Sequence, residues 1–236
     1  KINSNSRLLK DCKFLDCKGS KIFTTKGYFQ ANNIIFCGGL FSDRLANKDN
    51  VKLDLKIVSF RGEYYELKEK SKHKVKNLIY PVPNPEFPFL GVHFTRMIDG
   101  SIECGPNAVF TFKREGYQKG DFNLRDTFDA LSYFPTWRLF FKHWKFGIDE
   151  MKRSYSKRLF LNQLKRIIPS LSMDDIQPGR SGVRAMSLGK NGEIIDDFRI
   201  INQGRNIHVL NAPSPAATAC LSIGSEILNK YKKIII

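Results

Sequence analysis

One histidine and a set of arginines stand in contexts where these residue types do chemistry. His93 and Arg96 lie on an expected strand over 90–97, which follows a loop made rigid by four prolines: Pro81, Pro83, Pro85 and Pro88. Near neutral pH an imidazole accepts a proton or donates a hydrogen bond. A guanidinium, here that of Arg96 or Arg114, can hold a carboxylate. The alternative is a histidine at the edge of the core beside two solvated arginines.

A second group of arginines lies in more apolar surroundings. Arg61 stands in the stretch SFRGEYYEL, and Arg180 and Arg184 stand in PGRSGVRA. A guanidinium inside an apolar strand is costly unless a carboxylate or phosphate pairs with it. We therefore expect these arginines to bind an anion, with Tyr64 and Tyr65 lining the same pocket. The alternative is ion pairing within the chain, to one of its 23 acidic residues.

The stretch over 206–228 has the pattern of an apolar strand, a turn and an amphipathic helix. Ser214 suits the N-cap of that helix and Pro215 its first position, so we expect the helix over 215–231. Ala216 and the small residues after it leave the helix start open, and no Asp or Glu occupies the first turn. The unpaired N–H groups and the positive end of the helix then favour an electron-rich ligand. An ordinary buried connection is the alternative.

A double glycine after an expected buried strand marks another candidate ligand contact. In FCGGLFSDRL, Gly38 and Gly39 let another group approach the backbone, and Ser42 is positioned to cap the short helix that follows. A strand, two glycines and a helix start in this order favour contact with a phosphate. The alternative is a tight turn that binds no ligand.

Composition limits the class of protein. The 236 residues are 42% hydrophobic and 26% charged, which suits a globular protein with a substantial core. The net charge of +16 suits nucleic acid, an acidic membrane surface or an anionic ligand. Because the cations are spread out, without zinc-finger spacing or an RNP-like aromatic box, we expect no nucleic-acid partner. The five cysteines form no CxxC pair, so we expect a reducing compartment, no disulfide framework and no metal site.

The periodicity of the chain predicts an α+β fold. Short strand patterns separated by glycine turns dominate the first half, and we expect an antiparallel sheet there. These patterns cover 7–15, 21–25, 28–36, 53–68, 78–82, 90–97 and 101–105. Two or three helices are expected within 124–171. Strands then return at 183–187, 194–201 and 207–210 before the last helix.

The helical stretch over 134–171 interleaves aromatic with basic residues. Its aromatic residues include Trp137, Phe140, Phe141 and Trp144, and its cations are Arg138, Lys142, Lys145, Lys152, Arg153, Lys157, Arg158, Lys165 and Arg166. This pattern is typical of helices that lie on an anionic membrane surface. We therefore expect a cytoplasmic protein, either free or peripheral on the inner membrane. The alternative is a packed helical layer with a solvated basic face.

Several motifs, in order and at consistent spacing, resemble a single family. They are RGEYY, YPVPNPEFPFLGVHF, GVHFTRMIDGSIECGPNAVFTFKREGY, PGRSGVRA and HVLNAPSPAAT. Together they are similar to the L-2-hydroxyglutarate dehydrogenase/oxidase family, FAD-dependent flavoproteins of the D-amino-acid-oxidase-like group, from about Ala31 to the last helix. The resemblance implies oxidation of the C2 hydroxyl of L-2-hydroxyglutarate to 2-oxoglutarate. FAD would be the cofactor, and the electrons would pass to a membrane quinone or to oxygen.

The resemblance also implies roles for individual residues. FCGGLFSDRLA is similar to an FAD contact, and HVLNAPSPAAT is similar to the loop beside the flavin. The candidate cofactor-binding residues are therefore Gly38, Gly39, Ser42, His208, Asn211, Ala212, Pro213, Ser214 and Ala216. The candidate residues for binding the dicarboxylate substrate are Arg61, Tyr64, Arg180 and Arg184. His93 is the first candidate for the base and His208 the second.

One feature of the family is absent, because no GxGxxG follows a strand in these residues. The resemblance thus implies the C-terminal part of the enzyme. We expect a partial FAD-binding domain over 1–50, a substrate-binding domain over 51–180 with a helical insert over 124–171, and a return to the FAD-binding domain over 181–236. Such a chain is expected to be inactive unless a second polypeptide supplies the glycine-rich loop. A non-catalytic remnant of a split gene and a basic interaction module are the alternatives.

Overall fold

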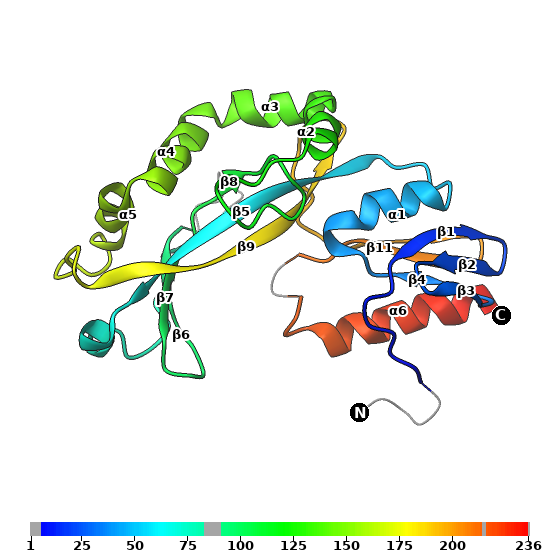
Figure 1. Cartoon of the computed structure of the whole chain (residues 1–236), viewed down its shortest axis with the longest axis horizontal. Coiled ribbons are helices and arrows are strands. Elements are labelled where there is room, and N and C mark those ends of the chain that lie inside the picture. The colour runs from blue at the N-terminus through cyan, green and yellow to red at the C-terminus, as the bar shows by residue number, and fades with distance from the viewer. Residues whose placement is uncertain (1–5, 83–90, 214–215, 236) are drawn as a thin grey trace. The chain divides into compact units, whose positions relative to one another are not determined.

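The computed structural model describes residues 6–82, 91–213 and 216–235. The chain divides into two compact units (Figure 1). Unit 1 comprises Lys1–Asp54 and Asp196–Ile236, and unit 2 comprises Leu55–Ile195. Helices combined with mostly antiparallel strands confirm the expected α+β class.

Unit 1 begins with a small antiparallel sheet of three strands. These are β1 (Phe14–Lys18), β2 (Lys21–Thr24) and β3 (Gly27–Gln30), in that order. The strand expected over 28–36 is divided, because Asn33 turns its side-chain amide to the carbonyl oxygen of Arg205, 2.8 Å away. The chain then resumes as the short strand β4 (Ile35–Phe36) in a different sheet.

The second sheet of unit 1 joins segments from both ends of the chain. It has the order β10 (Arg199–Gln203), β11 (Asn206–Asn211) and β4. β10 pairs with β11 in antiparallel fashion, whereas β4 and β11 are parallel, with His208 opposite Phe36. Two helices, α1 (Ser42–Lys48) and α6 (Cys220–Ile235), lie on opposite sides of this layer (Figure 1).

The last helix begins later than its sequence pattern predicts. Ala216 and the three residues after it form a turn, and α6 begins at Cys220 rather than at 215. Ser214 and Pro215, the expected cap and first helical residue, lie outside the described residues. A short helix in water depends on packing of one face, and the half-buried positions of α6 start only at Ile223.

Unit 2 is built on a long two-stranded ribbon. β5 (Leu55–Leu67) and β9 (Ile176–Gly189) pair in antiparallel fashion along their whole length (Figure 1). β9 therefore starts seven residues before the expected strand at 183, and its pairing with β5 holds residues 181–189 in unit 2. Residues 190–195 turn back onto β9, where the Ile195 N–H donates to the carbonyl oxygen of Ser187. The boundary of the units follows Ile195, whereas the sequence pattern predicts it after 180.

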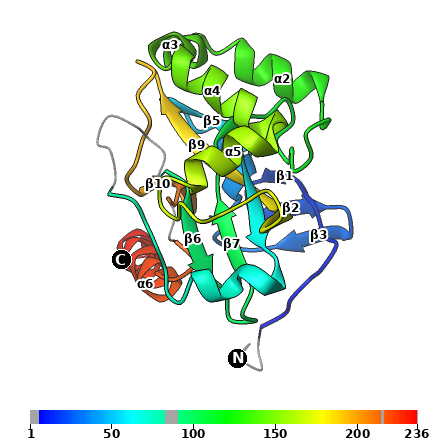
Figure 2. The same ribbon diagram turned by 90° about the vertical axis from the view of Figure 1, so that its left-hand side faces the viewer.

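Three short strands complete the sheet of unit 2. β7 (Ile102–Gly105) and β8 (Val109–Phe110) both pair with β5. β6 (His93–Arg96) pairs with β7, beside which it lies in Figure 2. All of these pairings are antiparallel, as expected. A 3-10 helix, Glu69–Lys74, follows the end of β5.

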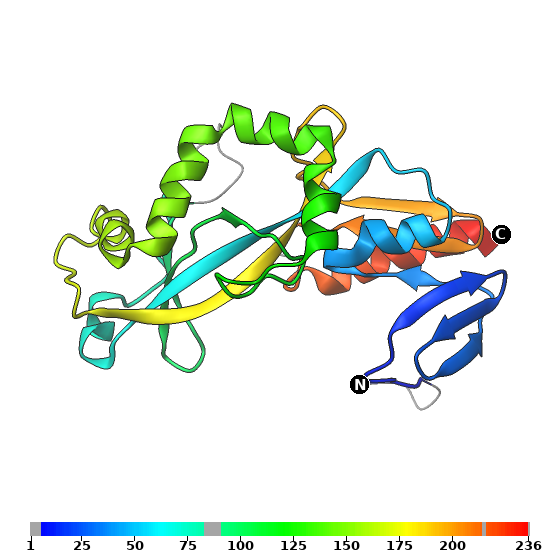
Figure 3. The ribbon, with the colours of Figure 1, turned by 45° about the horizontal axis from the view of Figure 1, so that its top comes forward.

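Between β8 and β9, residues 124–164 form four helices rather than two or three. They are α2 (Leu124–Leu131), α3 (Phe134–Lys142), α4 (Trp144–Tyr155) and α5 (Lys157–Leu164), and they succeed one another as an arch in Figure 3. The helices are separate because several have their own start signal. Asn123 caps α2, Ser156 caps α5, and a proline lies in the first turn of α3. Within the described ranges, no helix is both long and apolar enough to cross a membrane.

Two apolar clusters hold the helices of unit 2 to its sheet. α5 contributes Phe160 and Leu164 to a cluster with Phe94 of β6 and Ile102 of β7, all of them buried. α3 contributes Leu139 to a second cluster, which also contains these buried residues of β5 and β9: Val58, Phe60 and Leu188. Burial of each such side chain contributes roughly 1.5–3 kcal/mol to the stability of the fold.

Candidate functional site

Strand register places two of the predicted site residues, His93 and Tyr64, beside the same residue of β7 in unit 2. His93 of β6 is opposite Gly105 of β7, and Gly105 in turn lies against Tyr64 of β5. A Cβ atom at position 105 would stand 3.2 Å from the Tyr64 ring and 2.9 Å from a backbone oxygen of β5, and the residue has φ +143°. Only glycine fits this position, because a side chain there would collide with Tyr64 and with the backbone of β5.

The ring of His93 is held in one tautomer. Its Nδ1 lies 3.0 Å from the carbonyl oxygen of Gly91. Because a carbonyl oxygen only accepts, Nδ1 carries the hydrogen and Nε2 is the basic nitrogen. The ring of Tyr80 stacks on the imidazole, with centroids 4.3 Å apart and planes 18° from parallel. Burial lowers the pKa of His93 below its ordinary value of 6.5, and the nearby charge of Arg184 lowers it further.

Tyr64 and Arg184 form the second part of this cluster. Tyr64 occupies the irregularity in the pairing of β5 with β9, a kind of position where a strand can aim a side chain out of the regular alternation. Burial raises the pKa of the Tyr64 hydroxyl, and a hydrogen bond from the Arg184 guanidinium opposes that shift. A guanidinium, a phenol and a neutral imidazole can together hold a carboxylate and accept a proton from a neighbouring hydroxyl.

Arg61, in contrast, is engaged within the chain. Its Nε lies 3.0 Å from Oε1 of Glu63, and one of its Nη atoms donates to the carbonyl oxygen of Gln118 at 2.9 Å. Glu63 also accepts from Asn107 at 3.0 Å and from Ser154 at 2.8 Å. The four side chains of Arg61, Glu63, Asn107 and Ser154 are buried. Arg61 therefore forms an ion pair within the chain, as the alternative to anion binding predicts.

The other arginines differ in their surroundings. Arg180 is exposed on β9. Arg96 donates to the carbonyl oxygen of Val75 at 3.1 Å. Arg114 is buried and pairs with Asp129 at 2.9 Å. Arg114 is therefore buried in an ion pair, whereas Arg96 is exposed, as the solvated alternative predicts for it.

A second candidate site lies on unit 1, at one edge of its mixed sheet. Because β4 and β11 are parallel, their carboxyl ends share this edge, and the Ser42 hydroxyl donates to the carbonyl oxygen of Leu210 across it at 2.8 Å. The predicted cofactor residues that follow the two strands are thus neighbours. In doubly wound folds this edge is where ligands bind. Gly39, with φ +51°, has open space around it, while a side chain at Gly38 would collide with Leu45.

Individual cofactor candidates differ in what they can offer a ligand. Ser42 is the first residue of α1 and not its cap, since Phe41 holds the cap position and the Ser42 hydroxyl is used by β11. Asn211 is buried and donates to the carbonyl oxygen of Asp197 at 2.8 Å. Ala212 is exposed, and Pro213 and Ala216 are half-buried.

His208 has the surroundings of a core residue. It is 1% exposed, its Nε2 lies 2.7 Å from Oδ2 of Asp49, and its ring stacks on Phe36 at 4.5 Å. Asn206 donates to the same carboxylate at 2.9 Å. A ligand has no access to this imidazole in the structure described here, so the geometry ranks His93 above His208 as a base.

Several residues of these sites escape sequence reasoning. Tyr80, which stacks on His93, precedes the first proline of the rigid loop, and an aromatic residue there is the one local signal. Glu63 stands two residues after Arg61, and strand alternation places such a pair on one face, which is a local signal for the ion pair but does not exclude ligand binding. Nothing local marks Asp49 as the partner of His208. Among the described residues, no cluster of His, Cys, Asp and Glu could hold a metal ion.

Comparison with known proteins gives consistent similarities. The family described as "DAO: FAD dependent oxidoreductase" matches residues 5–228. An L-2-hydroxyglutarate dehydrogenase of Indibacter alkaliphilus is 50% identical over 209 residues, covering 88% of this chain and 52% of that protein. The L-2-hydroxyglutarate dehydrogenase of Escherichia coli K12 is 44% identical, covering 89% of this chain and 50% of that protein. The chain thus spans about half the length of these curated relatives.

Among solved structures, one similarity supports the fold. The FAD-bound, dithionite-reduced L-alpha-glycerophosphate oxidase of Mycoplasma pneumoniae superposes with a TM-score of 0.65 at 18% identity. The match covers 94% of this chain and 50% of the oxidase. At that identity the similarity concerns the fold alone.

Proposed function

We infer the function of this chain from its family, since the chain belongs to the DAO family of FAD-dependent oxidoreductases. We propose that it contributes to oxidation of the C2 hydroxyl of L-2-hydroxyglutarate, which yields 2-oxoglutarate. One observation carries the proposal: His93, Tyr64 and Arg184 come from three strands to one place in unit 2. The relatives named L-2-hydroxyglutarate dehydrogenase support the choice of substrate.

In this proposal His93 is the base. Its Nε2 accepts the proton of the C2 hydroxyl as the carbon loses its hydrogen with the electron pair and the C2–O bond becomes a carbonyl. The Gly91 carbonyl oxygen, 3.0 Å from Nδ1, holds the tautomer that leaves Nε2 basic. The lowered pKa of His93 keeps the imidazole neutral at pH 7, which a proton acceptor requires.

Arg184 and Tyr64 bind the substrate in this proposal. The guanidinium pairs with one carboxylate of the dicarboxylate, and the Tyr64 hydroxyl, already bonded to Arg184, gives that pair its orientation. We assign the second carboxylate to Arg180, which is exposed on the same strand. Arg61 keeps a supporting role, because its ion pair with Glu63 stabilises β5 beside Tyr64.

FAD is proposed to bind unit 1 at the shared carboxyl edge of β4 and β11. The open space at Gly39 and the exposed backbone at Ala212 suit a flat or phosphorylated group, and the candidate contacts there are Gly38, Gly39, Ser42, Asn211, Ala212, Pro213, Ser214 and Ala216. When bound, FAD supplies the acceptor for the two electrons of the C2–H bond. These residues fit part of a dinucleotide, since the chain contains no GxGxxG to hold the pyrophosphate.

The missing glycine-rich loop should weaken the affinity of the chain for FAD. The 236 residues bind FAD more weakly than the longer relatives do, and a segment carrying the glycine-rich loop, on a second polypeptide, restores binding and turnover. Absorbance of the purified chain in the flavin region measures this directly. A stoichiometric yellow protein would overturn it.

The electron acceptor and location complete the proposal. A membrane quinone and oxygen are both chemically suitable acceptors of the electrons. We propose a cytoplasmic protein that makes peripheral contact with the inner membrane. The aromatic and basic residues exposed on α3 and α4 support this contact.

The decisive experiment joins the chain to the half that its relatives possess. We would co-express it with the segment of the Indibacter alkaliphilus relative that this chain does not cover, and purify the reconstituted enzyme with FAD. The assay compares L-2-hydroxyglutarate with its D-enantiomer, L-malate and glycine. We expect turnover of the first compound only. An FAD-loaded complex that oxidises none of the four, or prefers glycine, would contradict the proposal.

A further inference from the structure

Within the described residues, the middle of β5 has no strand partner on one of its two edges. β8 pairs with β5 as far as Arg61, and β7 pairs with it from Tyr65 onward, so residues 62–64 lie between the two pairings. On the other edge, the register of β5 with β9 shifts between Glu63 and Tyr65. Tyr64 therefore lies where the hydrogen-bond ladder of the sheet is interrupted on both sides.

One residue of the loop between β7 and β8 takes the place of the absent strand. The N–H of Glu63 donates to Oδ1 of Asn107 at 2.7 Å, and the N–H of Asn107 donates to the carbonyl oxygen of Glu63 at 3.2 Å. Nδ2 of Asn107 also donates to Oε2 of Glu63 at 3.0 Å. Both backbone polar groups of the residue before Tyr64 are thus bound to Asn107, which is 3% exposed.

The Glu63 carboxylate holds the amide of Asn107 in one orientation. Because a carboxylate accepts and a backbone N–H donates, Nδ2 must face the carboxylate and Oδ1 the N–H. The carboxylate is itself fixed, since its Oε1 accepts from Nε of Arg61 at 3.0 Å and from the hydroxyl of Ser154 on α4 at 2.8 Å. The amide therefore has a single favourable position against β5.

The loop that carries Asn107 is in direct contact with β5. A Cβ atom at Gly62 would stand 2.9 Å from Cβ of Pro106, which leaves no space for a side chain between the loop and the strand. Gly105, just before the loop, lies against the Tyr64 ring. A shift of the loop would therefore change the backbone surface that this ring contacts.

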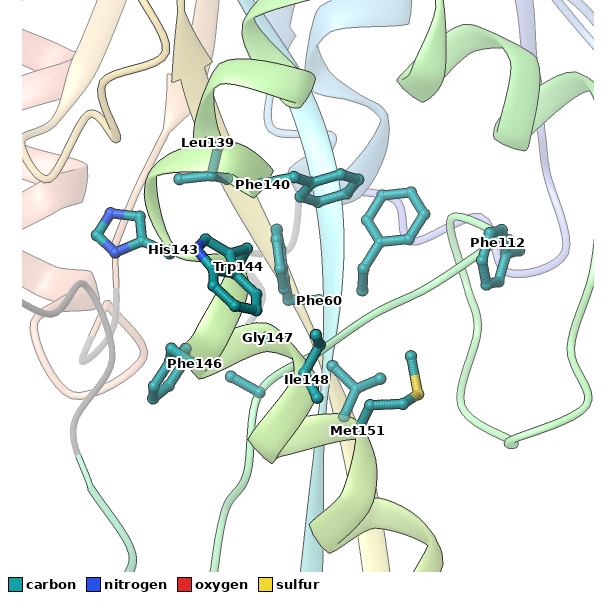
Figure 4. Close-up of a pocket in the computed structure, with 13 residues that line it drawn as sticks. Phe60, Phe112, Leu139, Phe140, His143, Trp144, Phe146, Gly147, Ile148 and Met151 are labelled. Atoms are coloured by element: carbon teal, nitrogen blue, oxygen red, sulfur yellow. The ribbon is translucent and has the colours of Figure 1, made fainter.

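Packing gives the end of this loop incomplete support. Ala108 lines an apolar cavity of about 390 Å³, which Phe140 of α3 and Trp144 of α4 also line (Figure 4). A segment beside a cavity has fewer van der Waals contacts than one in a filled core. Oε2 of Glu150 accepts from the N–H of Ala108 at 3.0 Å and ties the loop to α4. The hold on β5 comes from Asn107.

We propose that Asn107 is a positioning residue for substrate binding, because its three hydrogen bonds to Glu63 keep the backbone of β5 where the Tyr64 hydroxyl meets the Arg184 guanidinium. The inference rests on the proposed function, in which Tyr64 and Arg184 bind one carboxylate of the substrate. Asn107 acts through β5 and is not a catalytic residue.

Asn107→Ala should weaken substrate binding more than turnover. The variant loses both side-chain bonds to Glu63, so Tyr64 is no longer fixed beside Arg184. In the reconstituted enzyme, KM for L-2-hydroxyglutarate should rise roughly tenfold, the worth of one hydrogen bond to a charged group. The value of kcat should change by less than about threefold, because the carbonyl oxygen of Gly91 still holds His93.

Two further variants separate positioning from a general loss of stability. Asn123→Ala is the matched control, since Oδ1 of Asn123 also accepts from a backbone N–H of unit 2, that of Asp126 at 3.0 Å. It should lower stability without changing KM. Asn107→Asp keeps the shape and the acceptor for the Glu63 N–H but replaces the donor with an oxygen. It should raise KM at least as much as Asn107→Ala, because two carboxylates then face each other.

A spectroscopic measurement on the chain alone needs neither FAD nor a second polypeptide. The chain would be labelled with fluorotyrosine, and the fluorine resonance of residue 64 would be assigned by its loss in Tyr64→Phe. Asn107→Ala should shift and broaden this resonance, whereas Asn123→Ala should leave it in place. Circular dichroism and urea denaturation establish that each variant is folded under the conditions of the measurement.

The outcomes distinguish this inference from the proposed function. A resonance of Tyr64 that ignores Asn107→Ala would overturn the positioning role, whether or not the reconstituted enzyme is active. An equal rise of KM in Asn123→Ala, or a fall in kcat at unchanged KM in Asn107→Ala, would overturn it as well. If the resonance responds but the reconstituted enzyme oxidises none of the tested compounds, Asn107 still positions Tyr64 and the proposed function is wrong.

Discussion

The surroundings of His93 and of His208 differ although both histidines lie on short strands next to apolar neighbours. His93 bonds through Nδ1 to a backbone carbonyl oxygen, stacks on the half-exposed ring of Tyr80, and has Arg184 nearby. His208 is 1% exposed, and its Nε2 is bound to the carboxylate of Asp49 at 2.7 Å.

The difference supports the proposal that His93 is a reactive histidine and His208 a structural one. At His93 the hydrogen bond uses the nitrogen that carries the hydrogen and leaves the basic nitrogen for a ligand. At His208 a carboxylate and the Phe36 ring hold the imidazole in the core of unit 1. Mutation of the first should thus affect chemistry, and mutation of the second should affect folding.

The largest effect is expected at His93. In the reconstituted enzyme, His93→Gln should lower kcat for L-2-hydroxyglutarate by about 10²–10⁴-fold, the usual contribution of a positioned base. The free energy of unfolding should fall by only about 1–2 kcal/mol, since the variant loses the stacking on Tyr80 and the bond to Gly91. His73→Gln, at an exposed histidine of the same unit, is the control for both measurements. Unchanged kcat would remove His93 from the chemistry.

A smaller effect, on stability alone, is expected at His208. His208→Ala leaves the Asp49 carboxylate without one partner and opens a void beside Phe36, so it should cost about 2–4 kcal/mol of unfolding free energy. Urea denaturation measures the change. If the variant kept full stability but lost FAD-dependent turnover, the structural role of His208 would be wrong.

Tyr80 tests whether the stacked ring positions His93. Tyr80→Leu removes a stacking interaction worth about 0.5–1.5 kcal/mol, so kcat should fall by roughly three- to tenfold while KM changes little. Tyr80→Phe retains the ring and should restore most of the rate. Equal losses in both variants would point instead to the Tyr80 hydroxyl, which lies 3.3 Å from that of Thr95.

The pH dependence should give the smallest effect. Because the pKa of His93 lies below 6.5 and only the neutral imidazole accepts a proton, kcat/KM should be flat near pH 7 and fall on the acid side as His93 becomes protonated. Arg184→Gln removes a charge that lowers this pKa, so the acid limb should move to higher pH. An NMR titration of His93 checks the same shift without turnover. A limb that stays in place would show that Arg184 does not act on His93.

Sequence reasoning succeeded where the pattern is local, since it predicted an antiparallel sheet with a helical insert. Its choice of His93 and Tyr64 as site residues stays a prediction. It could not choose between ligand binding and ion pairing for Arg61, because the choice depends on Glu63, Asn107 and Ser154, and the last two are remote in sequence. The number of helices in the insert was also out of reach, since their boundaries depend on single caps such as Asn123 and Ser156.

The parallel pairing of β4 with β11 has a consequence for biosynthesis. Residue 34 bonds to Asn206, 172 positions later, whereas every strand of unit 2 lies within one continuous segment. On the ribosome, the segment of unit 2 is complete before β11 is translated. β4 therefore keeps an unpaired edge until β11 is translated, which is most of the synthesis of this chain. A chaperone that binds unpaired nascent strands would therefore stay bound longest at Ile35 and Phe36.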